Sequence, residues 1–360
     1  MRNRQERDYF NDNGRKLRMV VNPTQTAAEI NEIPDIISHQ LAKGLEKYWD
    51  VGNKLRVANL HGFITCARGT SDHAAKFFKY LIETQTGLPV ASIGPSVASI
   101  YKAHLKLGGF AAISFSQSGG SPDILALQKA AKEGGAKTIA VLNVTDSPLG
   151  WDVETILPTY SGPEKGVAAT KSFVGMLIAS LGILAGYLND RSILLTLQKL
   201  PDLAQKSLTP GWSSVSEPVT NAVSLYCIGR GLGYAIASEA ALKFKELCLL
   251  HAEAYSAAEV LHGPAAIAHE RFVALFFESS GLVSVSMEAA RQNMKSRGAT
   301  VNSLGLANRI STQLNSDQEK EFLSPILQSI SFYVFVEELA RNLGQNPDNP
   351  LGLQKVTKTL

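Results

Sequence analysis

Residues 113–123, ISFSQSGGSPD, carry the clearest signal of the fold. An apolar strand is predicted over 110–115, and it runs into a turn rich in serine and glycine. A helix is predicted to begin after this turn, because Ser121 is a favourable N-cap and Pro122 fits the first helical turn. The segment is therefore one strand–turn–helix unit of an α/β protein.

Similar units lie on both sides of this segment. Upstream we expect a helix over 24–48 that is kinked or restarted at Pro34. Further strands are predicted over 62–67, 90–93, 137–144, 222–229, 272–277 and 300–304, and further helices over 71–84, 121–133, 235–250 and 325–343. Because the strands are apolar on both faces and alternate with helices, the pattern predicts parallel sheets covered by helices.

Two segments, 64–81 and 225–244, resemble each other, since each runs from a strand through an Arg-Gly turn into a helix. We interpret this likeness as a tandem duplication of one α/β unit of roughly 150 residues. Prolines gather in 189–220, so a boundary is expected near 190–200. The predicted parts are an N-terminal extension, expected to be mobile (1–23), a first unit with its N-terminal helix (24–193), a second unit (194–344) and a C-terminal tail (345–360).

Composition excludes several classes of protein. The chain has 360 residues, 45% of them hydrophobic, and a net charge of +3, which excludes a disordered chain. The small net charge also argues against a strongly basic nucleic-acid binder. Residues 1–18 lack the apolar stretch of a signal peptide, and the apolar run 173–187 is shorter than the ~20 residues that a membrane span needs. We expect that run to form a core or subunit-interface helix and the protein to be cytoplasmic.

The three cysteines, Cys66, Cys227 and Cys248, are odd in number and far apart, and none stands at metal-ligand spacing with another cysteine or a histidine. In a chain without a secretion signal they are expected to be reduced, buried thiols.

The turn 116–121 has the properties of a phosphate site. Backbone N–H groups at the start of a helix attract an anion, and the hydroxyls and the amide of this turn can donate further hydrogen bonds. No lysine follows at P-loop spacing, so a nucleoside triphosphatase is excluded. The pattern predicts a pocket that binds one phosphate monoester through uncharged donors, although a polar turn that only caps a helix has the same pattern. Thr70 and Ser71 follow a neighbouring strand, so they are expected to face the same crevice.

A second candidate for chemistry is the charged helix 238–250. Lys243 lies four residues after Glu239 and three before Glu246, so the three side chains share a face. A carboxylate beside a lysine in a cleft can move protons, while the alternative is an ordinary solvated ion-pair face. Farther on, His262 stands before Gly263-Pro264, a sharp turn that would expose the imidazole. The histidines interpreted as structural are His39, His61, His73, His104 and His269.

Five blocks in order resemble the SIS (sugar isomerase) family, and most closely the isomerase half of glucosamine-6-phosphate synthase. They are ARGTS (67–71), SQSGGSPD (116–123), GPEKGVAATKSF (162–173), EAALKFKELCLLHAEAYSAAEVLHGP (239–264) and DNPLGLQKVTKT (348–359), and the likeness covers roughly residues 27–360. The resemblance implies two tandem SIS domains, each a flavodoxin-like three-layer sandwich with a parallel sheet flanked by helices.

The resemblance also implies roles for single residues. Ser116, Gln117, Ser118 and Ser121 would bind the sugar phosphate, and Thr70, Ser71, Glu164 and Val167 would line the sugar site. Glu246 would move a proton between C1 and C2 beside Lys243, His262 would open the ring from the partner subunit of a homodimer, and Lys355 would form a Schiff base with the open-chain sugar. Ala169 stands where the synthase has a serine that bonds the sugar, which leaves sugar specificity open.

The reaction direction is inferred from the start of the chain. In the synthase a glutaminase cysteine follows the initiator methionine, whereas here Arg2 follows Met1, so we expect no glutaminase. The resemblance then favours a SIS-type glucosamine-6-phosphate deaminase, which forms fructose 6-phosphate and ammonia without a metal or organic cofactor. Galactosamine-6-phosphate deaminase/isomerase and fructosamine-6-phosphate deglycase are the alternatives within this chemistry. A non-catalytic sugar-phosphate sensor is the alternative of another class.

Overall fold

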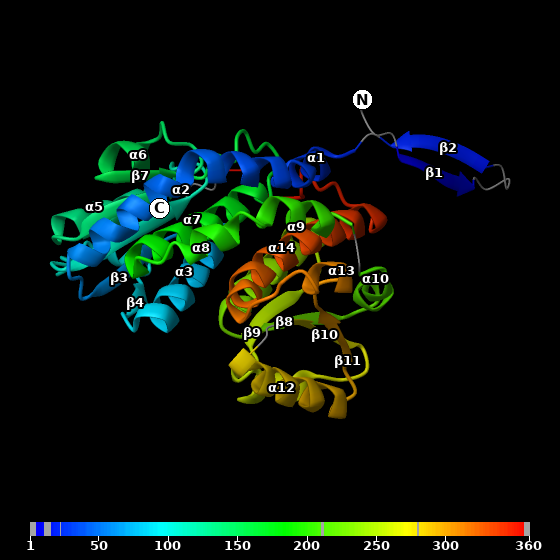
Figure 1. Cartoon of the computed structure of the whole chain (residues 1–360). Coiled ribbons are helices and arrows are strands. Elements are labelled where there is room, and N and C mark those ends of the chain that lie inside the picture. Colours follow the sequence, from blue (N-terminus) through cyan, green and yellow to red (C-terminus); the bar gives the residue numbers. More distant parts are fainter. Residues whose placement is uncertain (1–4, 11–15, 22, 210–211, 279–280, 356–360) are drawn as a thin grey trace.

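Two parallel β-sheets with helices packed against them make up the two halves of the molecule (Figure 1). The computed structural model describes residues 5–10, 16–21, 23–209, 212–278 and 281–355. The first sheet has the order β4 (Val90–Ser92), β3 (Gly62–Cys66), β5 (Phe110–Ser116), β6 (Lys137–Leu142), β7 (Thr155–Pro158), and the second the order β11 (Thr300–Leu304), β10 (Phe272–Phe277), β8 (Ser224–Gly229), β9 (Ala252–Ser256). All pairings in both sheets are parallel, which confirms the predicted fold class.

The helices follow the strands in the expected alternation. Those of the first half are α1 (Gln25–Asn31), α2 (Ile33–Val57), α3 (Thr70–Thr86), α4 (Ser96–Ser99), α5 (Pro122–Glu133), α6 (Pro148–Asp152) and α7 (Lys171–Leu188). Those that follow are α8 (Ser192–Leu197), α9 (Leu200–Ser207), α10 (Ser213–Thr220), α11 (Leu232–Cys248), α12 (Ser284–Ser296), α13 (Asn308–Ser311) and α14 (Asp317–Asn342). The restart expected at Pro34 is found, because α1 ends at Asn31 and Pro34 lies in the first turn of α2.

The two halves repeat one topology. Strands β4-β3-β5-β6 of the first sheet correspond in order to β9-β8-β10-β11 of the second. The Arg-Gly turns also correspond, since Gly69 before α3 has φ 55° and ψ −134°, and Gly231 before α11 has φ 56° and ψ −129°. This backbone conformation is essentially restricted to glycine. The predicted duplication is therefore confirmed in detail.

The apolar run predicted as a core or interface helix is α7, which lies within the core of the first half. It is the one helix among the described residues that is long and apolar enough to cross a membrane, but 89% of that stretch is buried inside the protein. Its backbone meets α2 closely: a Cβ added to Gly52 would lie 2.0 Å from the carbonyl oxygen of Ile183. Glycine at this crossing lets two helices pack at a distance that larger side chains would prevent.

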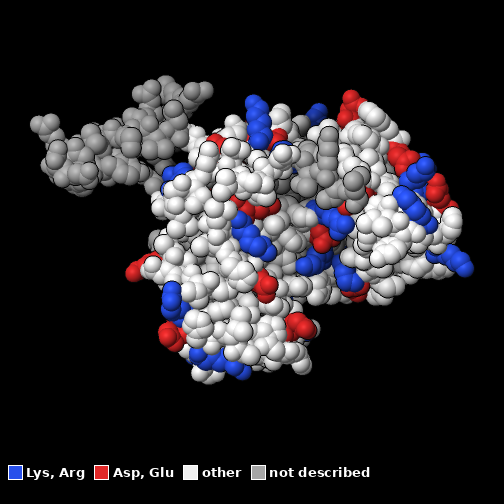
Figure 2. Space-filling model, turned by 180° about the vertical axis from the view of Figure 1, so that it is seen from behind, with Lys and Arg blue, Asp and Glu red and all other residues white. Residues whose placement is uncertain are grey.

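The three cysteines are buried and unpaired, as expected. Burial raises the pKa of the Cys66 and Cys248 thiols to about 12. Figure 2 shows acidic and basic side chains interspersed over one face of the molecule, in keeping with the small net charge.

Several elements differ from the sequence prediction. Helix α14 begins at Asp317 rather than near Pro325, because Ser316 caps it by accepting a hydrogen bond from Glu319 and the buried packing tolerates a proline inside. The short strands β7 and β9 and the helix α12 were not predicted. Residues 5–10 and 16–21, in the extension, pair as antiparallel strands β1 and β2. Residues 1–4, 11–15 and 22 lie outside the described residues, and the mobility of the extension stays a prediction.

Candidate functional site

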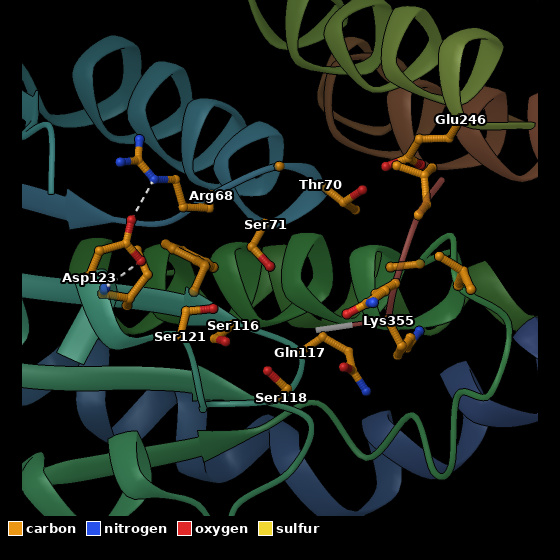
Figure 3. Close-up of a pocket in the computed structure, with 17 residues that line it drawn as sticks. Arg68, Thr70, Ser71, Ser116, Gln117, Ser118, Ser121, Asp123, Glu246 and Lys355 are labelled. Atoms are coloured by element: carbon orange, nitrogen blue, oxygen red, sulfur yellow. Dashed lines mark hydrogen bonds and ion pairs between the residues drawn. The ribbon is translucent and has the colours of Figure 1, made fainter. Parts of the chain in front are cut away.

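A cavity of about 350 Å³ opens at the carboxyl edge of the first sheet, where β3 and β5 end (Figure 3). The order in which strands are added to the sheet reverses at β3, because β4 lies on one side of β3 and β5 on the other, although all three run parallel. Open parallel sheets bind ligands at such a switch point. Three distant segments complete the cavity, namely the loop before α7 (Val167, Ala169), the end of α11 (Glu246) and the C-terminal tail (Leu353, Gln354, Lys355).

The serine-rich turn forms one end of the cavity, and Ser116, Gln117, Ser118 and Ser121 all line it. The Ser116 hydroxyl accepts a hydrogen bond from the Gly119 N–H (2.9 Å), which folds the turn back on itself. Gly119 has φ 64°, and a Cβ there would lie 2.1 Å from the Ser147 hydroxyl. Ser121 occupies the N-cap position of α5, but its side chain makes no capping hydrogen bond, contrary to the expectation from sequence, so its hydroxyl is available to a ligand.

A cation also lines this end of the cavity. The guanidinium of Arg68 donates from Nε to Asp123 Oδ2 (3.0 Å), and the Asp123 side chain is 3% exposed while that of Arg68 is 55% exposed. We expected uncharged donors only, and Arg68 was missed although it lies in the ARGTS block. Its partner is 55 positions away, so the pairing follows from the adjacency of β3 and β5 rather than from local sequence.

Glu246 lies across the cavity from the serine turn (Figure 3). Its Oε2 accepts a hydrogen bond from Lys243 Nζ at 2.7 Å. Lys243 itself is fully buried behind the cavity wall, where it also donates to Thr70 Oγ1 (2.8 Å) and lies 3.1 Å from Glu239 Oε1. Burial alone would lower the pKa of Lys243, but Glu239 and Glu246 outweigh this and raise it. Lys243 is therefore a permanent cation next to Glu246.

Glu239 is the centre of a buried network that joins the two halves. It accepts hydrogen bonds from Tyr333 on α14 (3.0 Å) and Thr70 on α3 (3.3 Å), and His73 Nδ1 lies 2.8 Å from its Oε2. Burial opposes ionisation of Glu239, yet Lys243 and then His73 lower its pKa. The spacing of Glu239 and Lys243 was visible in the sequence, but His73 was interpreted as structural and Tyr333 was missed.

The C-terminal tail forms another part of the cavity wall through Leu353, Gln354 and Lys355. Lys355 Nζ donates to the Gly166 carbonyl (2.7 Å) and reaches Glu164 Oε2 (3.4 Å). Glu164 does not line the cavity; it accepts from the backbone N–H groups of Thr170 (3.0 Å) and Ser172 (3.1 Å) and so shapes the loop that carries Val167.

Asp348 anchors the tail. Its carboxylate accepts the backbone N–H groups of Gln25 and Thr26, both at 2.8 Å, at the start of α1. This anchor, absent from the sequence prediction, is what places Lys355 at the cavity.

His262 stands apart from these groups. It is exposed after a 3₁₀ turn (Glu259–Leu261) in the second half and is not among the residues that line the cavity of its own chain. Within the described ranges, no group of three or more His, Cys, Asp or Glu side chains is placed to hold a metal ion.

Comparisons with known proteins agree on one family. The family model described as "SIS domain" matches residues 58–181 and 219–342. The glutamine–fructose-6-phosphate aminotransferase [isomerizing] of Pyrobaculum aerophilum is 33% identical over 347 residues, which cover 91% of this chain and 56% of that protein. The chain thus spans about half the length of the curated relatives that it matches.

Solved structures extend the comparison. A chain from Silicibacter pomeroyi, assigned as a phosphosugar isomerase, superposes with a TM-score of 0.83 at 36% identity, covering 91% of this chain and 100% of that one. Glucosamine-6-phosphate deaminase from Thermotoga maritima superposes with a TM-score of 0.69 at 20% identity, covering 93% of this chain and 100% of that one, which is a likeness of fold.

Proposed function

The chain belongs to the SIS domain family, and from this premise we propose that it is an enzyme that deaminates an amino-sugar phosphate. The proposed reaction converts D-glucosamine 6-phosphate and water into D-fructose 6-phosphate and ammonia. One observation carries the proposal: a single cavity has the serine turn at one end and Glu246 and Lys355 on its other sides.

The phosphate would bind at the serine turn. Hydroxyls of Ser118 and Ser121, the Gln117 amide and the N-terminus of α5 offer hydrogen bonds to its oxygens, and Arg68 adds positive charge. Binding energy gained at this remote group orients C1 and C2 of the sugar toward the opposite wall, which is how positioning lowers a reaction barrier.

Proton transfer would be the work of Glu246. In the open-chain aldehyde the C2 proton is acidified by the C1 carbonyl. Glu246 removes it while O1 takes a proton from water, which gives an enaminol; Glu246 then returns its proton to C1 while the amino group gives one back to the solvent, which leaves a C=N bond at C2. Water then adds to C2, and the C2–N bond breaks to release ammonia and the ketone. The buried Lys243 ammonium, 2.7 Å from Glu246 Oε2, orients that carboxylate before it accepts the proton.

Lys355 and His262 complete the proposal. Lys355, at the cavity wall, is placed to stabilise or bind the open-chain carbonyl, and it must then release the Gly166 carbonyl. His262, remote from the cavity of its own chain, would serve ring opening in the partner subunit of a homodimer.

Mixed dimers test this arrangement. Separately inactive His262→Ala and Glu246→Gln chains, when mixed and allowed to exchange, are expected to regain about a quarter of wild-type activity, because half of the dimers are mixed and each holds one intact site. No recovery in a mixture shown to contain mixed dimers would contradict the shared site.

The residue at position 169 bears on which amino-sugar phosphate is preferred. Ala169 presents a methyl group to the cavity where a polar side chain could read a sugar hydroxyl. Galactosamine 6-phosphate and fructosamine 6-phosphate are therefore the candidate substrates to compare with glucosamine 6-phosphate.

Ammonia release by the purified protein tests the function. With glucosamine 6-phosphate we expect ammonia and fructose 6-phosphate in equal amounts, and the same assay with the two other amino-sugar phosphates ranks specificity by kcat/KM. Tight binding of all three without any ammonia would favour a sugar-phosphate sensor and overturn the enzymatic proposal.

A further inference from the structure

A second cavity, of about 210 Å³, lies at the edge of the second sheet. It is bounded by Glu278, which follows β10, by Leu306, which follows β11, and by side chains of α13 and α14. All of its lining residues belong to the described part of the chain. It shares no lining residue with the cavity that holds Glu246.

The second cavity lies where the duplication predicts a ligand site in the second half. Strands β10 and β11 correspond to β5 and β6, and the cavity opens at their carboxyl ends, as the first cavity does at the end of β5. Helix α14 follows the last strand of its sheet as α7 does in the first half. Ligands of open parallel sheets bind at this edge, so the second half keeps the location of a ligand site.

Gln328 points to a ligand that donates a hydrogen bond. The residue is 2% exposed and lines the cavity. Its Nε2 donates to the Glu278 carbonyl at 2.7 Å, which fixes the amide orientation because a carbonyl oxygen cannot donate. Its Oε1 is buried and has no hydrogen-bond partner in the described structure. Unpartnered buried acceptors are rare and costly, so a hydroxyl or N–H of a ligand would satisfy this group.

Lys320 points to an anion. Lys320, Ser324 and Gln328 are spaced by four residues on α14 and form one stripe along the cavity. No carboxylate among the described residues pairs with the Lys320 ammonium. The nearby acid Glu278 is paired with Arg291 rather than with Lys320, since its Oε1 lies 2.6 Å from Arg291 Nη2, and Arg291 also pairs with Glu288. The cavity therefore presents one available cation, one serine hydroxyl on the same stripe and one acceptor.

We propose that this cavity is a second binding site, for a small anion that carries hydroxyl groups, of the polyol-phosphate class. The phosphate would contact Lys320, and a hydroxyl would donate to Gln328 Oε1. Leu306 and Leu314 would pack against the carbon chain. This proposal does not rest on the proposed deaminase activity.

Calorimetric titration with glucitol 6-phosphate, which has no carbonyl to isomerise, tests the site. The full-length wild-type chain is expected to bind two molecules. Lys320→Ala is expected to weaken one of the two events about tenfold, the loss of a charge-assisted hydrogen bond, and to leave ammonia release unchanged. Lys295→Ala, an exposed lysine on α12, is the matched control and should leave both events intact.

Two further titrations distinguish the contribution of the ligand's hydroxyl groups from that of its phosphate. Gln328→Leu should weaken the same event as Lys320→Ala, with melting followed to confirm folding, and inorganic phosphate should bind there more weakly than glucitol 6-phosphate. A titration in which Lys320→Ala weakens no binding event would overturn the site. Inorganic phosphate binding as tightly as glucitol 6-phosphate would overturn the role of the hydroxyl groups.

Discussion

Lys243 shows how one buried side chain sets the chemistry of its neighbours. Its ammonium lies between two carboxylates, of which Glu239 is buried and Glu246 reaches the cavity with 23% of its side chain exposed. The raised pKa of Lys243 keeps it charged across the pH range in which proteins are stable, so a cation always accompanies Glu246. The spacing of these three residues can be read from the sequence, but which carboxylate reaches the cavity cannot.

Glu246→Gln separates binding from chemistry. The amide keeps the shape of the side chain but cannot take a proton, so turnover is expected to fall about 10²–10⁴-fold. Affinity for glucitol 6-phosphate at the serine turn should change little, because that end of the cavity is untouched. Steady-state kinetics and calorimetry measure the two effects, with Glu133→Gln on the surface of α5 as the control. Near-normal turnover in Glu246→Gln would refute its role.

Among the elements, the two Arg-Gly turns could be located from the sequence, but their backbone conformation could not be predicted from it. Both turns were recognised as strand-to-helix connections, because apolar strands and glycine leave a clear pattern. Their shared conformation, with φ near 55°, could not be predicted, because glycine permits this conformation but does not require it. The short strands β7 and β9 were missed because half-exposed strands lack a strong apolar pattern. The start of α14 was missed because Pro325 suggests a helix start, whereas the buried helix continues through it.

The two turns provide a matched pair of variants. A Cβ at Gly69 would meet no atom within 4 Å, and one at Gly231 would meet only Val283 Cγ1 at 3.9 Å, an ordinary contact. Gly69→Ala and Gly231→Ala are therefore expected to cost stability through backbone strain alone, about 1–3 kcal/mol each. Only Gly69 precedes residues that line the cavity, so only Gly69→Ala should also lower activity. Denaturant unfolding and kcat/KM measure both effects. Equal losses of activity in the two variants would contradict this view of the duplicated turns.

At the scale of the molecule, Glu239 ties the two halves together. Its partners His73 and Tyr333 are 166 and 94 positions away in sequence, which is why pattern reasoning did not assemble the network. The same applies to the tail, where Asp348 binds the start of α1 from 322 positions away. Local patterns predicted the elements and the phosphate turn, whereas contacts between remote segments needed the folded chain.

Glu239→Gln is expected to lower the free energy of unfolding by about 3 kcal/mol, because the buried Lys243 loses the one of its two counter-charges that is itself buried. The folded state lowers the pKa of Glu239, so the unfolded state binds a proton first as the pH falls. Wild-type stability from this carboxylate is therefore present above its ordinary pKa of about 4.3 and is lost below it.

Unfolding measured between pH 7 and pH 3 checks this prediction. The wild type should lose stability more steeply than Glu239→Gln as the pH falls, and the exposed control Glu270→Gln should follow the wild type. Parallel curves for the wild type and Glu239→Gln would show that Glu239 is not the buried anion described above.

A crystal structure of Glu246→Gln soaked with glucosamine 6-phosphate tests the central claim most directly. We expect the phosphate within hydrogen-bond distance of the Ser116–Ser121 turn, with C1 and C2 of the sugar in contact with the side chain at position 246 and Lys355 beside the C1 end. A hexose bound elsewhere, or bound at the turn with C1 and C2 facing away from position 246, would contradict it.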